Sequence, residues 1–310
     1  MMLALYRGRA RKTKVREENI MKKLLALLLT GCMMAATVVG CGAKEEPAAT
    51  EAPAVEETAE AEAATEEAVE ETAEAESDLA YVKDKGVLVV GITDFAPMDY
   101  KNEAGEWIGF DADMAKGFAE KLGVDVEFVE IDWDNKILEL DGKTVDCIWN
   151  GMTLTDEVKA AMDCSNAYCN NAQVVIVPAD KAADYQTVES LEGLAFAVEA
   201  GSAGEKEVTA LGLECTPVKA QSDALMEVAA GTSDAAVIDS LMAAAMVGEG
   251  TGYADLTYTV GLNSEEYGVG FRKGSDLVAE LNAYFAESYE NGTMQECADT
   301  YGVAAALVAQ

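Results

Sequence analysis

An acidic, low-complexity segment over residues 42–78 limits where this chain can build a folded core. Between residues 44 and 78 it holds 13 Glu and one Asp against one Lys, and it has no Leu, Ile, Met or aromatic residue. Without large apolar side chains no core forms, and repulsion between like charges keeps such a segment extended. We therefore expect a disordered acidic tether over 42–78, with a reach of about 115 Å when fully stretched.

The residues before the tether have the composition of an export signal. Met21, Lys22 and Lys23 precede an apolar run over residues 24–39, and a short basic region followed by a short apolar region is typical of a secretory signal peptide. The run has 16 residues, whereas a membrane-spanning helix needs about 20. We expect a signal peptide region over residues 1–41 with Met21 as the true start. An N-terminal membrane anchor is the alternative.

The apolar run ends in Val38-Val39-Gly40-Cys41, which resembles the lipobox of bacterial lipoproteins. In that family the cysteine is acylated and becomes the new N-terminus. The resemblance implies that Cys41 carries a lipid, which anchors a protein without spanning the membrane, and that the protein is extracytoplasmic. Leu29-Thr30-Gly31-Cys32 is a rival match, but it leaves an apolar region at the short end of the usual range of about 7–15 residues.

Charge and histidine content exclude several classes of function. With 57 Asp+Glu against 22 Lys+Arg, the formal net charge is −35 at pH 7. Nucleic-acid binding relies on clustered Lys and Arg, so we expect no nucleic-acid partner. The chain has no His, which excludes Ser-His-Asp and Cys-His catalytic pairs and His-ligated zinc. The usual glycine-rich nucleotide motifs are also absent, and we expect neither a metal nor a cofactor.

From residue 79 onward, strand-like and helix-like runs alternate. Apolar or alternating runs predict strands at 87–92, 124–131, 145–150, 174–177, 194–198, 235–238 and 269–271. Helical spacing predicts helices at 135–140, 222–230, 241–247 and 277–289. A further helix follows Gly109, with Met114, Phe118 and Leu122 on its apolar face and Gly123 at its C-terminus. This alternation predicts an α/β architecture.

Six short motifs occur in the order found in the polar-amino-acid solute-binding proteins of ABC importers. They are Gly109-Phe110-Asp111-x-Asp113, Gly151-Met152-Thr153-Leu154-Thr155, Asp163-x-Ser165-x-x-Tyr168, Gly201-Ser202, Ala236-Val237-Ile238-Asp239, and the segment from Tyr267 to Gly274. Each motif alone is weak, but all six in order, after a lipobox and a tether, are specific. The chain from about residue 85 to 302 thus resembles the family 3 type of solute-binding lipoprotein.

The resemblance implies a fold and a function. The expected fold is a two-lobed, periplasmic-binding-protein-like (type II) α/β fold with a hinge cleft. Lobe 1 is expected at 79–172 plus 268–305 and lobe 2 at 173–267, with chain crossings near 168–172 and 264–268. The expected function is capture of an amino acid or a related small amine between lobes that close like a hinge. The expected partners are an ABC permease and its ATPase. An enzyme on the same fold, similar to cyclohexadienyl dehydratase, is the alternative.

The resemblance also implies ligand-binding positions. Phe95 and Trp133 match positions whose rings surround the ligand side chain, and such rings offer contact area and a face for a cation. Asn150, Gly151, Met152 and Thr153 are expected to form a turn between a strand and a helix, with backbone groups aimed at the ligand.

Two further segments complete the expected site. Ser202 and Ala203 form a Gly-flanked turn before a helix, where free N–H groups and a hydroxyl can bind a carboxylate. Asp239 matches the carboxylate that pairs with the ligand α-amine in this family. The alternative for each is a purely structural role: Ser202 as the N-cap of the following helix, and Asp239 as an ordinary surface acid.

One position departs from the family. Where the family has an Arg that grips the ligand α-carboxylate, this chain has Val158. Arg272 is expected in a solvent-facing turn, and Lys159 points about 100° away from residue 158 on a helix. We therefore expect the ligand to carry an amine and no net negative charge: a neutral or basic amino acid, or an amine without the α-carboxylate.

Five cysteines remain after the two candidate lipid sites: Cys147, Cys164, Cys169, Cys215 and Cys297. Their spacing fits no zinc pattern. We expect small buried hydrophobes, and a Cys164–Cys169 disulfide is conceivable.

Overall fold

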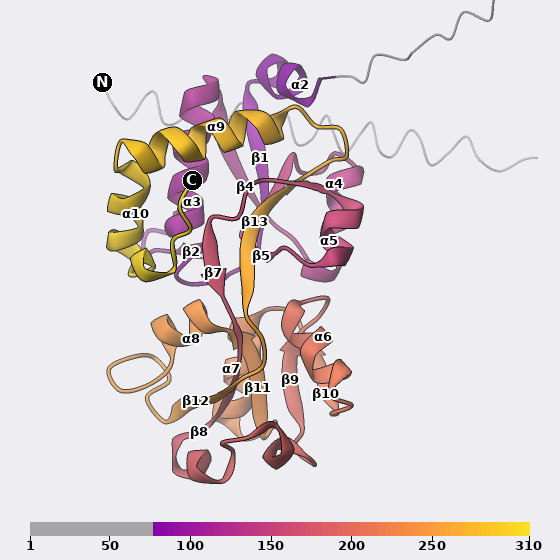
Figure 1. Ribbon diagram of the computed structural model, residues 1–310, viewed down its shortest axis with the longest axis vertical. Coiled ribbons are helices and arrows are strands. Elements are labelled where there is room, and N and C mark those ends of the chain that lie inside the picture. The colour runs from indigo at the N-terminus through magenta and orange to yellow at the C-terminus, as the bar shows by residue number, and fades with distance from the viewer. Residues whose placement is uncertain (1–76) are drawn as a thin grey trace, which may run out of the picture. The chain divides into compact units, whose positions relative to one another are not determined.

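The computed structural model describes residues 77–310, in which two separate β-sheets are each flanked by helices (Figure 1). We use lobe 1 for the part built on the six-stranded sheet and lobe 2 for the part built on the five-stranded sheet. The predicted alternation of strands and helices is confirmed. Cys41, Met21 and the tether up to residue 76 lie outside the described residues.

The sheet of lobe 1 has the order β4-β1-β5-β13-β6, with β7 also paired to β13. Its strands are β1 (Val87–Ile92), β4 (Asp125–Glu130), β5 (Cys147–Thr153), β6 (Asp163–Cys164), β7 (Cys169–Asn171) and β13 (Glu265–Phe271), and a hairpin of β2 (Tyr100–Lys101) and β3 (Trp107–Ile108) lies beside it. β1 is parallel to β4 and β5, whereas β13 is antiparallel to β5. β1 is the buried apolar strand that the sequence predicted.

Helices of lobe 1 bury apolar faces against this sheet. The helical segments of this lobe are α2 (Asp78–Lys85), α3 (Phe110–Leu122), η1 (Trp133–Asn135), α4 (Lys136–Asp141), α5 (Asp156–Ala161), α9 (Leu277–Glu290), α10 (Thr293–Tyr301) and η4 (Ala304–Ala306). Of these, α10 packs on α3 and α9 rather than on the sheet, and η4 has no buried residue. In α3 the predicted apolar residues Met114, Phe118 and Leu122 are all buried, and the helix ends at Gly123 in the left-handed conformation, with φ of 77°. A glycine favours this end because it has no Cβ to clash.

The sheet of lobe 2 has the order β10-β9-β11-β8-β12. Its strands are β8 (Gln173–Pro178), β9 (Phe196–Glu199), β10 (Cys215–Val218), β11 (Ala235–Asp239) and β12 (Leu256–Gly261), and its helices are η2 (Ala179–Asp184), η3 (Val188–Leu191), α6 (Ala203–Ala210), α7 (Gln221–Ala230) and α8 (Ser240–Met246). β8 and β11 are buried along almost their whole length, because helices cover both faces of the sheet.

Two strands connect the lobes. β7 leads through residue 172 into β8, and β12 leads through residues 262–264 into β13. β7 and β13 pair antiparallel, with Asn171 opposite Glu265 and Cys169 opposite Tyr267, so the two crossings run side by side (Figure 1). They lie where the two chain crossings were expected. Paired crossing strands restrict relative motion of the lobes to bending about this short ribbon.

The expected end of the tether at residue 78 is wrong. Ser77 is the N-cap of α2, and its Oγ accepts a hydrogen bond from the Ala80 amide at 2.9 Å. Asp78 is the first residue of α2 and is 7% exposed. Burial of an unpaired acid is unfavourable, so an ion-pair partner of Asp78 explains why this residue belongs to the folded part and not to the tether.

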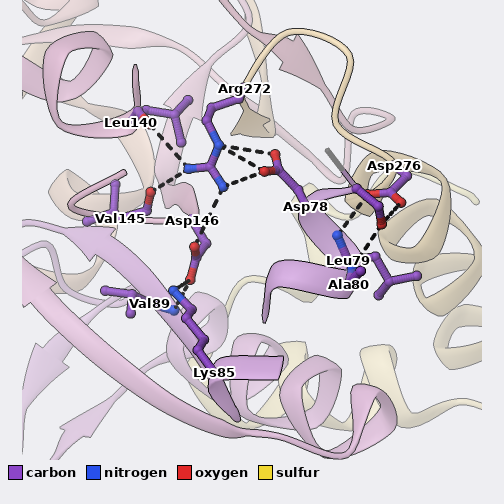
Figure 2. A network of polar contacts seen from close by, with 11 residues as sticks. Asp78, Leu79, Ala80, Lys85, Val89, Leu140, Val145, Asp146, Arg272 and Asp276 are labelled. Atoms are coloured by element: carbon purple, nitrogen blue, oxygen red, sulfur yellow. Dashed lines mark hydrogen bonds and ion pairs between the residues drawn. The ribbon is translucent and has the colours of Figure 1, made fainter. Parts of the chain in front are cut away.

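That partner is Arg272, which was expected to face solvent and is instead buried. Its Nη2 lies 2.9 Å from Asp78 and 3.6 Å from Asp146, and its Nη1 donates to the Val145 carbonyl at 2.8 Å (Figure 2). Lys85 completes the network, with its Nζ 2.6 Å from Asp146. The network therefore holds α2 against the residues that precede β5 and follow β13.

Two other findings concern the same described part. No helix among residues 77–310 is long and apolar enough to cross a membrane. The five cysteines in this range are all free thiols, so the conceivable Cys164–Cys169 disulfide is absent. Cys147 and Cys169 are buried, as expected of small hydrophobes, whereas Cys164, Cys215 and Cys297 are partly exposed.

Candidate functional site

A cavity between the two lobes brings together all ten ligand-binding residues predicted from the sequence. It encloses about 430 Å³ of space outside atoms, including the part that opens to solvent. The ten predicted residues that line it are Phe95, Trp133, Asn150, Gly151, Met152, Thr153, Val158, Ser202, Ala203 and Asp239. It also contains six residues that the sequence analysis did not select: Lys136, Thr155, Glu199, Gly201, Lys206 and Gln221.

The lobe 1 wall is the end of β5 rather than the expected turn. Residues 150–153 belong to the strand, and Met152 and Thr153 pair with Gly268 and Tyr267 of β13. The expectation is wrong because β13 continues the ladder past residue 150. The helix that follows, α5, has six residues, and Thr155 Oγ1 caps it by accepting a hydrogen bond from the Val158 amide at 3.1 Å.

Two buried acids hold this strand end in place. Gly151 has φ of 54°, and its N–H donates to Asp111 Oδ2 at 2.7 Å. A Cβ at Gly151 would lie 2.3 Å from the Phe95 ring, so the close approach requires glycine. Asn150 donates to Asp99 Oδ2 at 2.8 Å and to the Thr93 carbonyl at 3.1 Å.

Hydrogen bonds within the protein therefore use several polar groups that were expected to be free. Both amide hydrogens of Asn150 are engaged, and Thr153 Oγ1 donates to Glu265 at 2.8 Å. Ser202 Oγ accepts from the Glu205 amide at 3.1 Å as the N-cap of α6, which leaves its own hydroxyl hydrogen available to a ligand. Of the expected side-chain donors, Ser202 remains open.

Two aromatic side chains form an apolar part of the cavity. Phe95 is 2% exposed and Trp133 is 7% exposed. Phe95 packs edge-on against Tyr267, with ring centroids 6.3 Å apart. Trp133 lies beneath the ammonium of Lys136, whose Nζ is 4.8 Å from the ring centroid. Both positions thus suit contact with an aliphatic or cationic ligand side chain.

Val158 is buried in the cavity wall, and a lysine supplies the cation nearby. Lys136 is 8% exposed, and its Nζ donates to the carbonyls of Trp133 at 3.1 Å and Gly201 at 2.9 Å. Burial lowers the pKa of Lys136 to about 8. The sequence offered one signal for it: Lys136 follows Trp133 by three residues at the start of a short helix, and such pairs share a face.

Asp239 lies at the end of β11 and is 4% exposed. Its Oδ1 accepts hydrogen bonds from Tyr267 at 2.8 Å, from Gln173 at 2.9 Å and from Asn171. Gln221 donates to Oδ2. Burial, followed by the nearby charge of Glu265, raises the pKa of Asp239 to about 7. The carboxylate is therefore held in one orientation, while no cation among residues 77–310 forms an ion pair with it.

Glu199 is a second buried acid in the same cavity. It ends β9 and is 3% exposed, and its Oε1 has no hydrogen-bond partner within residues 77–310. Burial, together with the charge of Asp239, raises the pKa of Glu199 to about 8. The sequence analysis missed this residue; the available signal was an acid at the end of an apolar strand, two residues before Gly201.

Comparisons with known proteins agree with this geometry. Residues 88–304 match the family described as bacterial extracellular solute-binding proteins, family 3. The arginine-binding extracellular protein ArtP of Bacillus subtilis (strain 168) is 30% identical over 221 residues, which cover 68% of this chain and 84% of that protein. The L-cystine-binding protein TcyJ of Escherichia coli (strain K12) is 26% identical over 224 residues, covering 71% and 84%.

Solved structures show the same two-lobed fold. An ABC uptake transporter substrate-binding protein from Streptococcus pneumoniae, solved with bound histidine, has a TM-score of 0.68 at 30% identity, covering 73% of this chain and 96% of that chain. The ancestral amino-acid-binding protein AncCDT-1, a precursor of cyclohexadienyl dehydratase, has a TM-score of 0.67 at 30% identity, covering 73% and 99%. The predicted two-lobed fold is thus confirmed. Since the family match spans most of the folded part, the chain belongs to the bacterial extracellular solute-binding proteins, family 3.

Proposed function

We propose that this protein is an extracytoplasmic receptor that captures an amino acid between its lobes and delivers it to an ABC permease with its ATPase. The observation that carries the proposal is the cavity between the lobes, in which the buried carboxylate of Asp239 lies with Trp133 and Lys136. A zwitterionic ligand complements this arrangement because it offers an ammonium, a carboxylate and a side chain.

The two charged ends of the ligand have distinct partners in this proposal. The ammonium binds Asp239, which four side-chain donors hold in orientation. The carboxylate binds the Ser202 hydroxyl and the free amides that begin α6, with Lys136 as the cation in place of the arginine that Val158 replaces. Because Lys136 lines the cavity, an α-amino acid is favoured over the decarboxylated amines that the sequence analysis also allowed.

The same charges determine which amino acids bind. Two buried acids face one buried lysine in the cavity, and Lys206 is already paired with Glu157. A ligand carboxylate in the side chain would add a further negative charge beside Glu199 and Asp239. Neutral and basic amino acids should therefore bind, and glutamate and aspartate should bind poorly.

Mass spectrometry of the ligand that copurifies with the protein tests this function, followed by a thermal-shift panel of amino acids. A ligand at 100 times its Kd stabilises a protein by about 2.7 kcal/mol, which such a panel detects. A largest shift with glutamate or aspartate would contradict the proposal, as would a panel in which no amino acid shifts the folded protein.

We also propose that Cys41 carries the lipid that anchors the receptor to the cell membrane. The lipobox-like segment before it supports this assignment. Cys41→Ala should release the protein into the medium or leave it unprocessed. If Cys41→Ala stays membrane-bound while Cys32→Ala does not, Cys32 is the lipidated residue.

An enzyme on the same fold is the second candidate, and one observation favours it. Glu199 is a buried acid in the cavity with a pKa near 8, which suits a general acid at neutral pH. The relatives named above are binding proteins, apart from the ancestral protein's description as a precursor of an enzyme. Turnover of the bound ligand by the isolated protein would establish the enzyme, and unchanged ligand after long incubation would support the receptor.

A further inference from the structure

Glu199 makes no ion pair in the part of the chain that the structure describes, although the charge of Lys136 and hydrogen bonds from Gln221 and Thr93 partly offset the rise of its pKa. No ion pair involves it among residues 77–310, and its Oε1 accepts no hydrogen bond there. The ammonium of Lys136 lines the same cavity, but it donates to the carbonyls of Trp133 and Gly201 instead. Glu199 is also 3% exposed, so bulk water does little to compensate its charge.

A buried acid with no ion pair and one oxygen without a hydrogen bond is costly for a folded protein. Removing an ionised carboxylate from water without a compensating cation is strongly unfavourable, and the group then tends to take up a proton. The raised pKa of Glu199 agrees with this cost. Asp239 differs because four side-chain donors surround it. One acid is sufficient for the α-ammonium of a ligand, and Glu199 is therefore in excess of what a neutral amino acid requires.

We propose that Glu199 binds a second cationic group on the ligand, so that this receptor is selective for basic amino acids. The inference rests on the proposed function and adds the ligand's side-chain class. The ligand's side-chain ammonium or guanidinium would pair with Glu199 Oε1, and its aliphatic stem would pack against Trp133 and Phe95, which line the same cavity. Each charged group of a basic amino acid then has one partner: the side-chain cation pairs with Glu199, the α-ammonium with Asp239 and the carboxylate with Lys136.

Lys136 separates basic amino acids from diamines. A diamine such as cadaverine also offers two cationic groups, but it has no carboxylate to pair with the ammonium of Lys136. The Lys136 ammonium would then share the cavity with the two ammonium groups of the diamine. Lysine and cadaverine differ only in this carboxylate, as do arginine and agmatine. The proposal therefore predicts tighter binding of the amino acid in each pair.

Isothermal titration calorimetry on the full chain, freed of copurified ligand, tests the proposal with two matched pairs. Lysine is compared with norleucine, which lacks the side-chain charge, and arginine is compared with citrulline, which replaces the guanidinium by a neutral group. The basic member should bind at least roughly 30-fold more tightly in each pair, because a buried charge-assisted bond is worth about 2 kcal/mol or more. Equal affinities within a pair would overturn the assignment of Glu199, while binding of norleucine and citrulline would leave the proposed function intact.

Substitution of Glu199 tests the residue itself. Glu199→Gln keeps the size of the side chain and removes its charge, so the lysine-to-norleucine ratio should fall to within about threefold of unity. Glu192→Gln is the matched control, because Glu192 is an exposed acid of the same lobe, and it should keep the full ratio. A Glu199→Gln variant that keeps the ratio would overturn the proposal. If that variant does not fold, the wild-type ratios decide the outcome. Tighter binding of cadaverine than of lysine would overturn the assignment to an amino acid.

Discussion

Lys136 Nζ lies 2.9 Å from the carbonyl oxygen of Gly201, and this hydrogen bond joins lobe 1 to lobe 2 across the cavity. An ion pair between Glu157 of lobe 1 and Lys206 of lobe 2 closes the same side. Both contacts depend on close approach of the lobes, whereas the paired strands β7 and β13 hold the lobes together in any state. The structure is thus that of a closed receptor.

Ligand binding should shift the receptor from a more open form to this closed form. The two contacts across the cavity mouth, and the ion pairs of Lys219 with Glu130 and Asp132 that also join the lobes, are exposed or made to neutral groups, and contacts of this kind are worth about 1 kcal/mol each. They are too weak to keep the lobes closed without a ligand. Small-angle X-ray scattering should show a smaller radius of gyration at saturating ligand. An unchanged radius would contradict hinge closure.

Lys136→Met should weaken the binding of α-amino acids roughly 10- to 100-fold, because the ligand carboxylate loses its cation and is left with neutral donors. Binding of the corresponding decarboxylated amine should change far less. Lys181→Met is the control, since Lys181 is an exposed lysine of lobe 2, and it should bind both ligands as the parent does. Calorimetry of the parent and both variants, each with the amino acid and the amine, measures the difference. Equal losses for the amino acid and the amine would place Lys136 outside carboxylate recognition.

Asp78→Ala should destabilise the folded part by about 3 kcal/mol, because the charge of the buried Arg272 guanidinium is then compensated only by the more distant Asp146 among the described residues. Urea unfolding measures the change in the free energy of unfolding. Asp84→Ala removes an exposed acid from the same helix and should change this free energy by less than about 0.5 kcal/mol. Similar effects from both variants would show that the Asp78–Arg272 pair does not fasten α2.

The stability of the ligand-free protein should fall as the pH rises from about 5 to 8. The folded protein raises the pKa of Asp239 to about 7 and that of Glu199 to about 8. The folded state therefore binds more protons than the unfolded state in this window, and stability decreases with pH. Lys136, which also faces Glu199, has a pKa lowered to about 8 and contributes a rise in stability only above that pH.

The melting temperature as a function of pH checks this expectation. Glu199→Gln should flatten the fall between pH 5 and 8, and a bound basic amino acid should flatten it too, because its cation compensates the carboxylate. Glu192→Gln should keep the parent's slope. A parent protein whose melting temperature rises over this window would contradict the burial of uncompensated acids in the cavity.

Local sequence signals were sufficient for the elements and the strand ends that carry the site. β1, α3 and β11 follow from apolar runs and spacing, and Asp239 could be selected because it ends a buried strand. The family's motifs then located ten residues that the fold brings to one cavity. These signals are short in range, and they did not show that residues 150–153 continue β5 instead of forming a turn.

Long-range packing determined what the sequence analysis missed. Arg272 was expected to face solvent because it lies in a turn that normally does so, but Asp78 and Asp146 meet it from segments 194 and 126 residues away in the sequence. Lys136 and Glu199 were not selected because the family's motifs do not include them. A weak local signal existed for each residue, but it is the meeting of the two lobes that brings both into one cavity.

Calorimetric titration of lysine and arginine into the parent protein and into Asp239→Asn tests the central claim most directly. Asp255→Asn is the control, because Asp255 is an exposed acid of lobe 2. The account predicts that the parent and Asp255→Asn bind with the same affinity, and that Asp239→Asn loses at least roughly 100-fold because the ligand ammonium no longer meets a carboxylate. An Asp239→Asn variant that binds these amino acids as well as the parent does would contradict the account.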